Sequence, residues 1–146
     1  MSKLTVKLYC IVLICIVTII GCDWGRTPSN IRFPKNFNVR LPSDVKVIRD
    51  EYEDMGNDYA IYYTVKLTTT EMNSFIYDMK HLNNFYLSPP SNENERSNKL
   101  LVKQYREGAW YKTSNDYRFF KENRGTSLNA FVDTVNLSIE FQEFGR

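Results

Sequence analysis

Side chains that commonly perform catalysis are scarce in this sequence of 146 residues. It contains one histidine, His81, and three cysteines, Cys10, Cys15 and Cys22. A zinc site of the usual kind needs several Cys and His ligands, and His81 lies far along the chain from every cysteine. A catalytic serine needs a base, and no Gly-x-Ser-x-Gly turn accompanies the single histidine. We therefore expect a non-enzymatic protein with no catalytic residue, metal ion or cofactor, and a surface position for His81.

The acidic stretch from Asp50 to Asp58, DEYEDMGND, is the one segment where a cation could bind. If Gly56 is aligned with the glycine of a calcium loop, Met55 falls at a ligand position, and a thioether is a poor ligand for a hard cation. The segment therefore reads as a solvated acidic turn. Hydrolysis by paired carboxylates stays open as an alternative, because any two of the 17 acidic residues could converge in the fold.

Tyrosine is abundant, with 10 residues, and the second half of the chain is locally rich in Lys and Arg. Tyrosine and arginine often supply much of the binding energy at protein interfaces. The candidate interface residues are Tyr62, Tyr105, Tyr111 and Arg118. The alternative interpretation is an amphipathic sheet whose outer face carries Tyr and Lys side chains only because it is in contact with water.

The first 21 residues differ in composition from the rest of the chain. Lys3 and Lys7 precede the apolar run Leu8–Ile20, and every acidic residue follows Cys22. A basic segment followed by a 13-residue apolar run is typical of an export signal, because a membrane-spanning helix needs about 20 apolar residues. Without this segment the basic and acidic residues balance at 17 each. We therefore expect no binding to nucleic acid, which usually requires a concentrated basic face.

The residues Ile19-Ile20-Gly21-Cys22 resemble the lipobox of bacterial lipoproteins. The resemblance implies diacylglycerol on the thiol of Cys22, cleavage between Gly21 and Cys22, and a membrane anchor formed by the acyl chains. The protein would then face the periplasm or the cell exterior. Asp23 resembles the signal that retains lipoproteins in the inner membrane of enteric-type Gram-negative bacteria. The alternatives are an uncleaved anchor over residues 4–20 and, for Asp23, an ordinary polar residue.

The remaining chain is long enough for one domain. Residues 22–38 contain Gly25, Pro28 and Pro34 without an apolar period, which predicts a flexible tether after the lipidated terminus. Residues 39–146 are predicted to form a single α+β domain. A first strand is expected near Val39 to Val47, and a second over residues 60–67.

The clearest helix is predicted after Thr68, whose spacing to Glu71 matches a capping box. Residues 88–98 are expected to form a polar loop, and residues 99–106 suit either a short helix or a strand. Strands are predicted over residues 110–111, 117–121, 127–132 and 135–144. The expected fold is an antiparallel sheet with one main amphipathic helix on one face, in the order β-β-α-loop-β-rich.

The sequence thus predicts a lipid-anchored, extracytoplasmic lipoprotein that binds another protein of the envelope. An immunity or inhibitor lipoprotein is the specific version, by analogy of size and location alone. An envelope-acting hydrolase that uses carboxylates and a structural surface lipoprotein are the alternatives.

Overall fold

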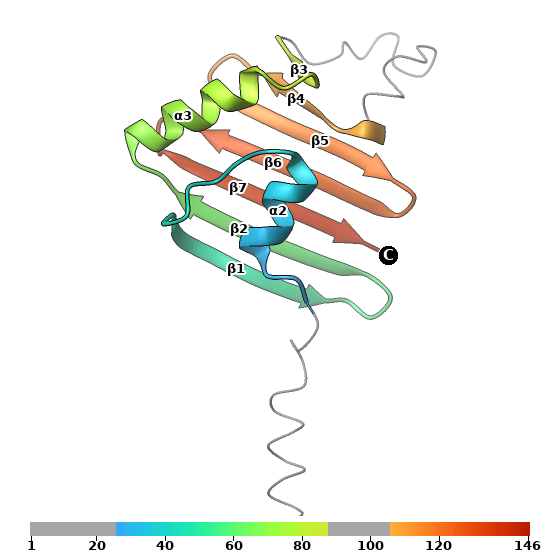
Figure 1. Ribbon diagram of the computed structural model, residues 1–146. Helices are drawn as coiled ribbons and strands as arrows, with labels where there is room; N and C mark the ends of the chain where they lie inside the picture. Colours follow the sequence, from blue (N-terminus) through green and yellow to red (C-terminus); the bar gives the residue numbers. More distant parts are fainter. Residues whose placement is uncertain (1–25, 88–105) are drawn as a thin grey trace, which may run out of the picture.

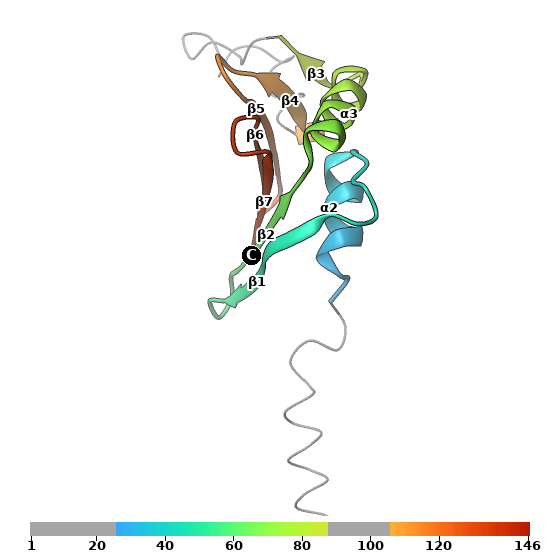
Figure 2. The ribbon, with the colours of Figure 1, turned by 90° about the vertical axis from the view of Figure 1, so that its left-hand side faces the viewer.

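The computed structural model describes residues 26–87 and 106–146. The predicted signal segment, Gly21, Cys22, Asp23, Tyr105 and the polar loop lie outside these residues. The described part forms one seven-stranded sheet, and two helices lie on the same face of it (Figures 1 and 2). The α+β class is confirmed in this coarse form, although the sheet dominates and the expectation of one main helix is corrected to two.

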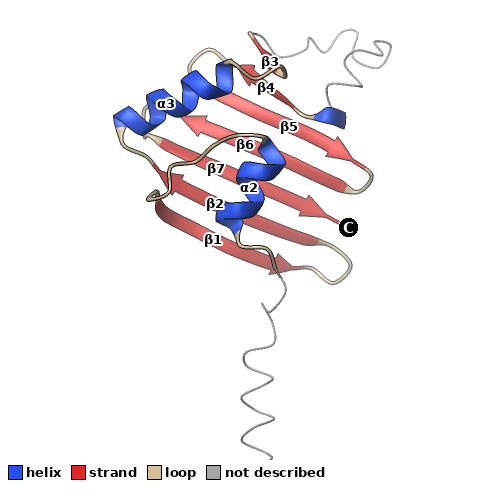
Figure 3. Ribbon diagram, in the orientation of Figure 1, coloured by secondary structure: helices blue, strands red, loops and turns tan. Residues whose placement is uncertain are grey.

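The sheet has the order β1-β2-β7-β6-β5-β4-β3. All neighbouring pairs are antiparallel except β3 and β4, which are parallel. The sheet is therefore mixed, whereas an antiparallel sheet was predicted. Figure 3 distinguishes the strands from the helices. The elements are α2 (Ser29–Phe37), β1 (Lys46–Asp54), β2 (Tyr59–Lys66), α3 (Thr69–Lys80), β3 (Phe85–Tyr86), β4 (Ala109–Lys112), β5 (Tyr117–Asn123), β6 (Thr126–Asp133) and β7 (Ser138–Gly145).

Strand β2 follows its predicted alternation. Ile61, Tyr63 and Val65 are buried toward the helices, and Tyr62 points to the other face and is partly buried. Successive side chains of a strand point to opposite faces, so the apolar pattern in the sequence indicated the core positions correctly.

Helix α3 also confirms its prediction. The Thr68 hydroxyl accepts a hydrogen bond from the backbone N–H of Glu71 at 3.3 Å, and the Glu71 carboxylate accepts one from the backbone N–H of Thr68 at 2.8 Å. The two reciprocal bonds complete the capping box, and the bonds that the Glu71 carboxylate accepts from the backbone N–H and the hydroxyl of Thr68 lower the pKa of Glu71. Met72, Phe75 and Met79 are buried, while His81 is exposed beyond the last turn, as expected.

Helix α2 corrects the predicted tether. Residues 29–37 are helical, and Phe33 and Phe37 are completely buried on the sheet. The tether interpretation was wrong here because a nine-residue helix with an internal proline has little local signal, and its stability comes from tertiary packing. The folded domain therefore begins before residue 39.

Strand β1 corrects two further predictions. The first strand begins at Lys46 instead of near Val39, and most of the predicted acidic turn is strand, with Asp50 opposite Tyr63 of β2. The turn itself is confined to residues 55–58, where Gly56 has a φ of +85°. Charged side chains are tolerated in β1 because it is an edge strand.

The last four strands match their predicted order, and the largest change of boundary is at the start of β7. Strand β7 begins at Ser138 and not at residue 135. The Asp133 carboxylate accepts backbone hydrogen bonds from Val135 and Asn136, at 3.0 and 2.7 Å, and holds these residues in a turn. These bonds lower the pKa of Asp133. Val135, expected in the strand, is 83% exposed at this turn.

Candidate interaction surface

The sheet face opposite α2 and α3, called the open face below, presents a band of aromatic side chains. Figure 2 shows that both helices lie on one side of the sheet. Strand register places two rows across the open face: Tyr62, Gln142, Asn129 and Phe120 in one, and Thr64, Glu140, Phe131, Arg118 and Tyr111 in the other. Because alternate residues of a strand share a face, residues distant in sequence become neighbours here.

Three of the four candidate interface residues lie on the open face. Tyr62 is partly buried on β2, Arg118 is exposed on β5, and Tyr111 is directly opposite Arg118 on β4. Tyr111 is only 5% exposed, and its ring stacks on Tyr86 with the centroids 5.7 Å apart. Tyr105 lies outside the described residues. Tyr62 and Arg118 are thus the candidates that are accessible to solvent, whereas Tyr111 is buried against Tyr86.

Two arginines lie over aromatic rings on this face. The guanidinium carbon of Arg49 is 4.1 Å from the centroid of the Tyr62 ring, and that of Arg118 is 5.3 Å from the Phe131 ring. The ring of Phe144 meets Tyr62 edge-on at 5.9 Å. Such contacts hold a cation beside an aromatic ring.

Arg49, Phe131 and Phe144 were not selected from the sequence. Their only sequence signal was strand alternation, which places Phe131 and Phe144 opposite the buried positions of β6 and β7. Arg49 was not predicted as an interface residue, because it lies directly before the stretch predicted to be an acidic turn. Its side chain bonds to Glu51 at 2.6 Å, and this bond raises the pKa of Arg49.

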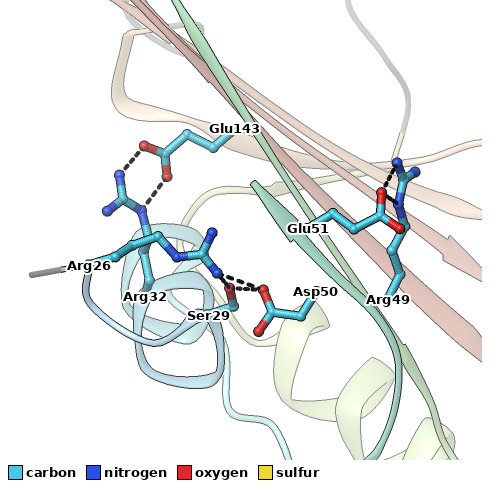
Figure 4. Close-up of polar contacts among 7 residues, drawn as sticks. All are labelled: Arg26, Ser29, Arg32, Arg49, Asp50, Glu51 and Glu143. Atoms are coloured by element: carbon cyan, nitrogen blue, oxygen red, sulfur yellow. Dashed lines mark hydrogen bonds and ion pairs between the residues drawn. The ribbon is translucent and has the colours of Figure 1, made fainter. Parts of the chain in front are cut away.

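A second polar cluster lies on the helix-covered face and fastens α2 to β7 (Figure 4). Glu143 is 2% exposed, and both of its carboxylate oxygens accept bonds from the Arg32 guanidinium, one of them at 2.8 Å. Asn36 and Tyr59 donate further bonds at 3.2 and 2.7 Å. Three side chains of the chain thus donate four hydrogen bonds to this carboxylate.

Burial and hydrogen bonding act in opposite directions on these groups. Burial raises the pKa of Glu143, but the bonds from Arg32, Tyr59 and Asn36 outweigh it and leave that pKa below its usual value. The bond to Glu143 raises the pKa of Arg32. Burial and the same carboxylate raise the pKa of Tyr59. The Glu143 carboxylate thus stays ionised and hydrogen-bonded to Arg32, which is typical of a structural ion pair.

A third contact fastens the start of α2 to the edge strand. The guanidinium of Arg26 donates to Asp50 at 2.9 Å, and the Ser29 hydroxyl donates to the same oxygen at 2.6 Å. Figure 4 shows these side chains on one side of β1 and the Arg49–Glu51 pair on the other. Four acidic residues of the stretch predicted to be a solvated turn therefore hold ion pairs: Asp50, Glu51, Glu53 and Asp58.

Within residues 26–87 and 106–146, no group of three or more His, Cys, Asp and Glu side chains is arranged to hold a metal ion. In the same described residues, no helix is both long and apolar enough to cross a membrane. Comparison with protein-family models, with curated proteins and with solved structures finds no match to this chain.

Proposed function

We propose that this chain is a lipid-anchored protein of the bacterial envelope that binds a partner protein through its open face and is not an enzyme. The observation that carries the binding role is the combination of Tyr62, Phe144 and Phe131 with two stacked arginines on a face that neither α2 nor α3 covers. The lipid anchor rests on the resemblance of residues 19–22 to a lipobox.

The chemistry of the open face favours a protein as the ligand. Aromatic and arginine side chains bury a large area at a small cost in conformational entropy, and they are enriched among the residues that dominate binding energy. Charges of both signs flank the rings, since Arg118 and Glu140 occupy the same row. A protein surface with interspersed polar groups complements such a face better than a uniformly charged polymer does.

An immunity or inhibitor role is the specific form of this proposal. It rests on analogy of size and location, and a structural surface role and a carboxylate hydrolase are the alternatives. The engagement of Glu143 by Arg32 and of Asp50 by Arg26 supports binding over hydrolysis, because a general acid or base must be able to exchange protons with a substrate.

The test is a pull-down from the envelope of the source bacterium with matched variants. We expect the wild-type chain to recover a stoichiometric partner, and Tyr62→Ala and Arg118→Glu to weaken that complex roughly 30-fold, as loss of about 2 kcal/mol at a central interface residue does. Tyr77→Ala is the control, because Tyr77 is a 64% exposed tyrosine on α3, away from the open face.

Thermal unfolding of each variant separates loss of binding from loss of folding. A partner that binds equally well to all three folded variants would contradict the assignment to the open face. Absence of any stoichiometric partner would count against the binding role itself.

A further inference from the structure

The direction of α2 shows where the chain enters the domain. At its start, Arg26 and Ser29 contact Asp50 on the edge strand β1. In its middle, the ring of Phe33 stacks on Tyr63 of β2, and at its end the ring of Phe37 packs 4.7 Å from Phe119 of β5. Helix α2 therefore crosses the strands from β1 toward β5, and the chain before it joins the domain at the β1 edge (Figures 1 and 2).

Only three residues separate Cys22 from Arg26. Four Cα–Cα steps span at most about 14 Å even when fully extended. Arg26 is held against Asp50 at 2.9 Å, so this end of the domain cannot move far from an anchor at Cys22.

Exposed apolar side chains gather at the same edge. Eight large hydrophobic residues are exposed in the described part of the chain, and five of them lie on α2, on β1 or in the turn after β1. These five are Ile31, Val47, Ile48, Tyr52 and Met55. Their exposed fractions run from 46% for Tyr52 to 57% for Ile31. Apolar side chains and tyrosine rings are favourable where headgroups meet hydrocarbon, so a lipid surface is the occupant that both observations indicate.

We propose that the β1 edge rests on the headgroup region of the bilayer and that the sheet stands on this edge. The proposal rests on the lipid anchor at Cys22 and adds an orientation to it. Strand β3 then lies farthest from the membrane, six interstrand steps or roughly 29 Å above β1. The open face stands upright beside the membrane, where a partner in the envelope can reach Tyr62 and Arg118.

The acidic residues of β1 set a limit on how deep this contact is. Asp50 and Glu51 are paired with Arg26 and Arg49, and these pairs keep their charge at the level of the hydrated headgroups. The backbone groups on the outer side of an edge strand also need water or another donor and acceptor. The contact is therefore superficial, and the acyl chains supply the attachment.

The experiment uses the mature chain, lipidated at Cys22, in variants that each carry one added cysteine. No cysteine follows Cys22, so Ile48→Cys on β1 and Leu87→Cys beside β3 each introduce one new thiol. Each purified variant is labelled with a fluorescent maleimide and reconstituted in vesicles of phosphatidylethanolamine and phosphatidylglycerol. A lipid with a nitroxide on its headgroup is the quencher.

We expect strong quenching at position 48 and little at position 87, because quenching by a headgroup nitroxide is short-ranged. Insertion of about a dozen Gly and Ser residues before Arg26 extends the reach of the chain to roughly 19 Å on average and should reduce the difference. Equal quenching at both positions, or stronger quenching at position 87, would overturn the orientation.

Two readouts separate failure of this inference from failure of the proposed anchor. Wild-type protein without added cysteine should take up no maleimide if Cys22 carries a thioether and residues 1–21 are removed. Labelling of that protein, or its failure to float with vesicles, would overturn the lipid anchor and with it the orientation. Flotation of an unlabelled wild type with no difference between positions 48 and 87 would overturn the orientation alone.

Discussion

At the scale of single residues, Glu143 is the least expected feature of the core. It occupies a core-facing position of β7, beside the completely buried Phe141 on the same face. A buried carboxylate is tolerated only when donors surround it, and Arg32, Asn36 and Tyr59 provide them. The cluster therefore determines where α2 packs on the sheet, because Arg32 and Asn36 of α2 bind Glu143 of β7.

Replacement of this carboxylate should destabilise the fold and reduce its sensitivity to acid. We expect Glu143→Gln to lower the free energy of unfolding by about 2–3 kcal/mol. This is less than the cost of about 3–5 kcal/mol for a broken buried ion pair, because the Arg32 side chain keeps 26% of its area in water. Urea denaturation at neutral pH measures the loss. Glu140→Gln, on the opposite face of the same strand, is the control and should change stability by less than about 0.5 kcal/mol.

The pH dependence follows from the lowered pKa of Glu143 in the folded chain. The ionised carboxylate contributes its full stability above the pKa it has in the unfolded chain. This contribution is lost as the pH falls through the lower folded-state value. Wild-type stability should therefore drop more steeply than that of Glu143→Gln as the pH falls below the ordinary glutamate pKa of 4.5, and parallel curves for the two proteins would contradict the assignment.

At the scale of elements, α2 is the piece of the domain most dependent on tertiary contacts. Phe33 stacks on Tyr63 and Phe141, and Phe37 packs among Phe119, Trp110 and Phe141. The indole N–H of Trp110 also donates to the backbone carbonyl of Phe37 at 3.2 Å. These contacts make α2 part of the core and not a spacer.

Truncation of one aromatic side chain should show this directly. We expect Phe37→Ala to lower the free energy of unfolding by about 3–5 kcal/mol, because it removes a fully buried ring and leaves a cavity between helix and sheet. Lys35→Ala, on the exposed side of the same helix, should cost less than about 0.5 kcal/mol. Equal stability of the two variants would indicate that α2 is not part of the cooperative fold.

At the scale of the whole molecule, location and folding should be separable. The part of the chain that the structure describes begins at Arg26, and Cys22 is the only cysteine after the apolar segment. The acyl chains would decide where the domain resides, while its core and ion pairs decide how stable it is.

We therefore expect Cys22→Ser to abolish incorporation of labelled fatty acid and to leave residues 1–21 attached. The purified domain should still unfold at an unchanged temperature, because the buried core lies within residues 33–141. Metabolic labelling and mass spectrometry measure the first effect, and thermal unfolding the second. Cys15→Ser is the control and should keep its label; continued labelling of Cys22→Ser would contradict the lipobox assignment.

The open face was only partly predictable from the sequence. Tyr62, Tyr111 and Arg118 were selected by residue type, and the register of β2, β4 and β5 brings them to one face. Arg49 and Phe131 were missed, because their roles depend on which residue lies across the sheet from each of them. Which residues lie opposite each other depends on strand register, which the apolar pattern and the turn geometry set together. The cross-strand neighbours of Arg49 and Phe131 therefore follow only from the strand pairing in the structure.

The sequence by itself determined β2, the capped helix α3 and the series of later strands, because apolar alternation and a capping box are local signals. It also carries the whole argument for the anchor, in residues 19–22. Only the tertiary structure decided that residues 29–37 are a helix and that the acidic stretch is an edge strand. In both cases the stabilising partners are distant in sequence: Tyr63, Phe119 and Phe141 for α2, and the backbone of β2 for β1.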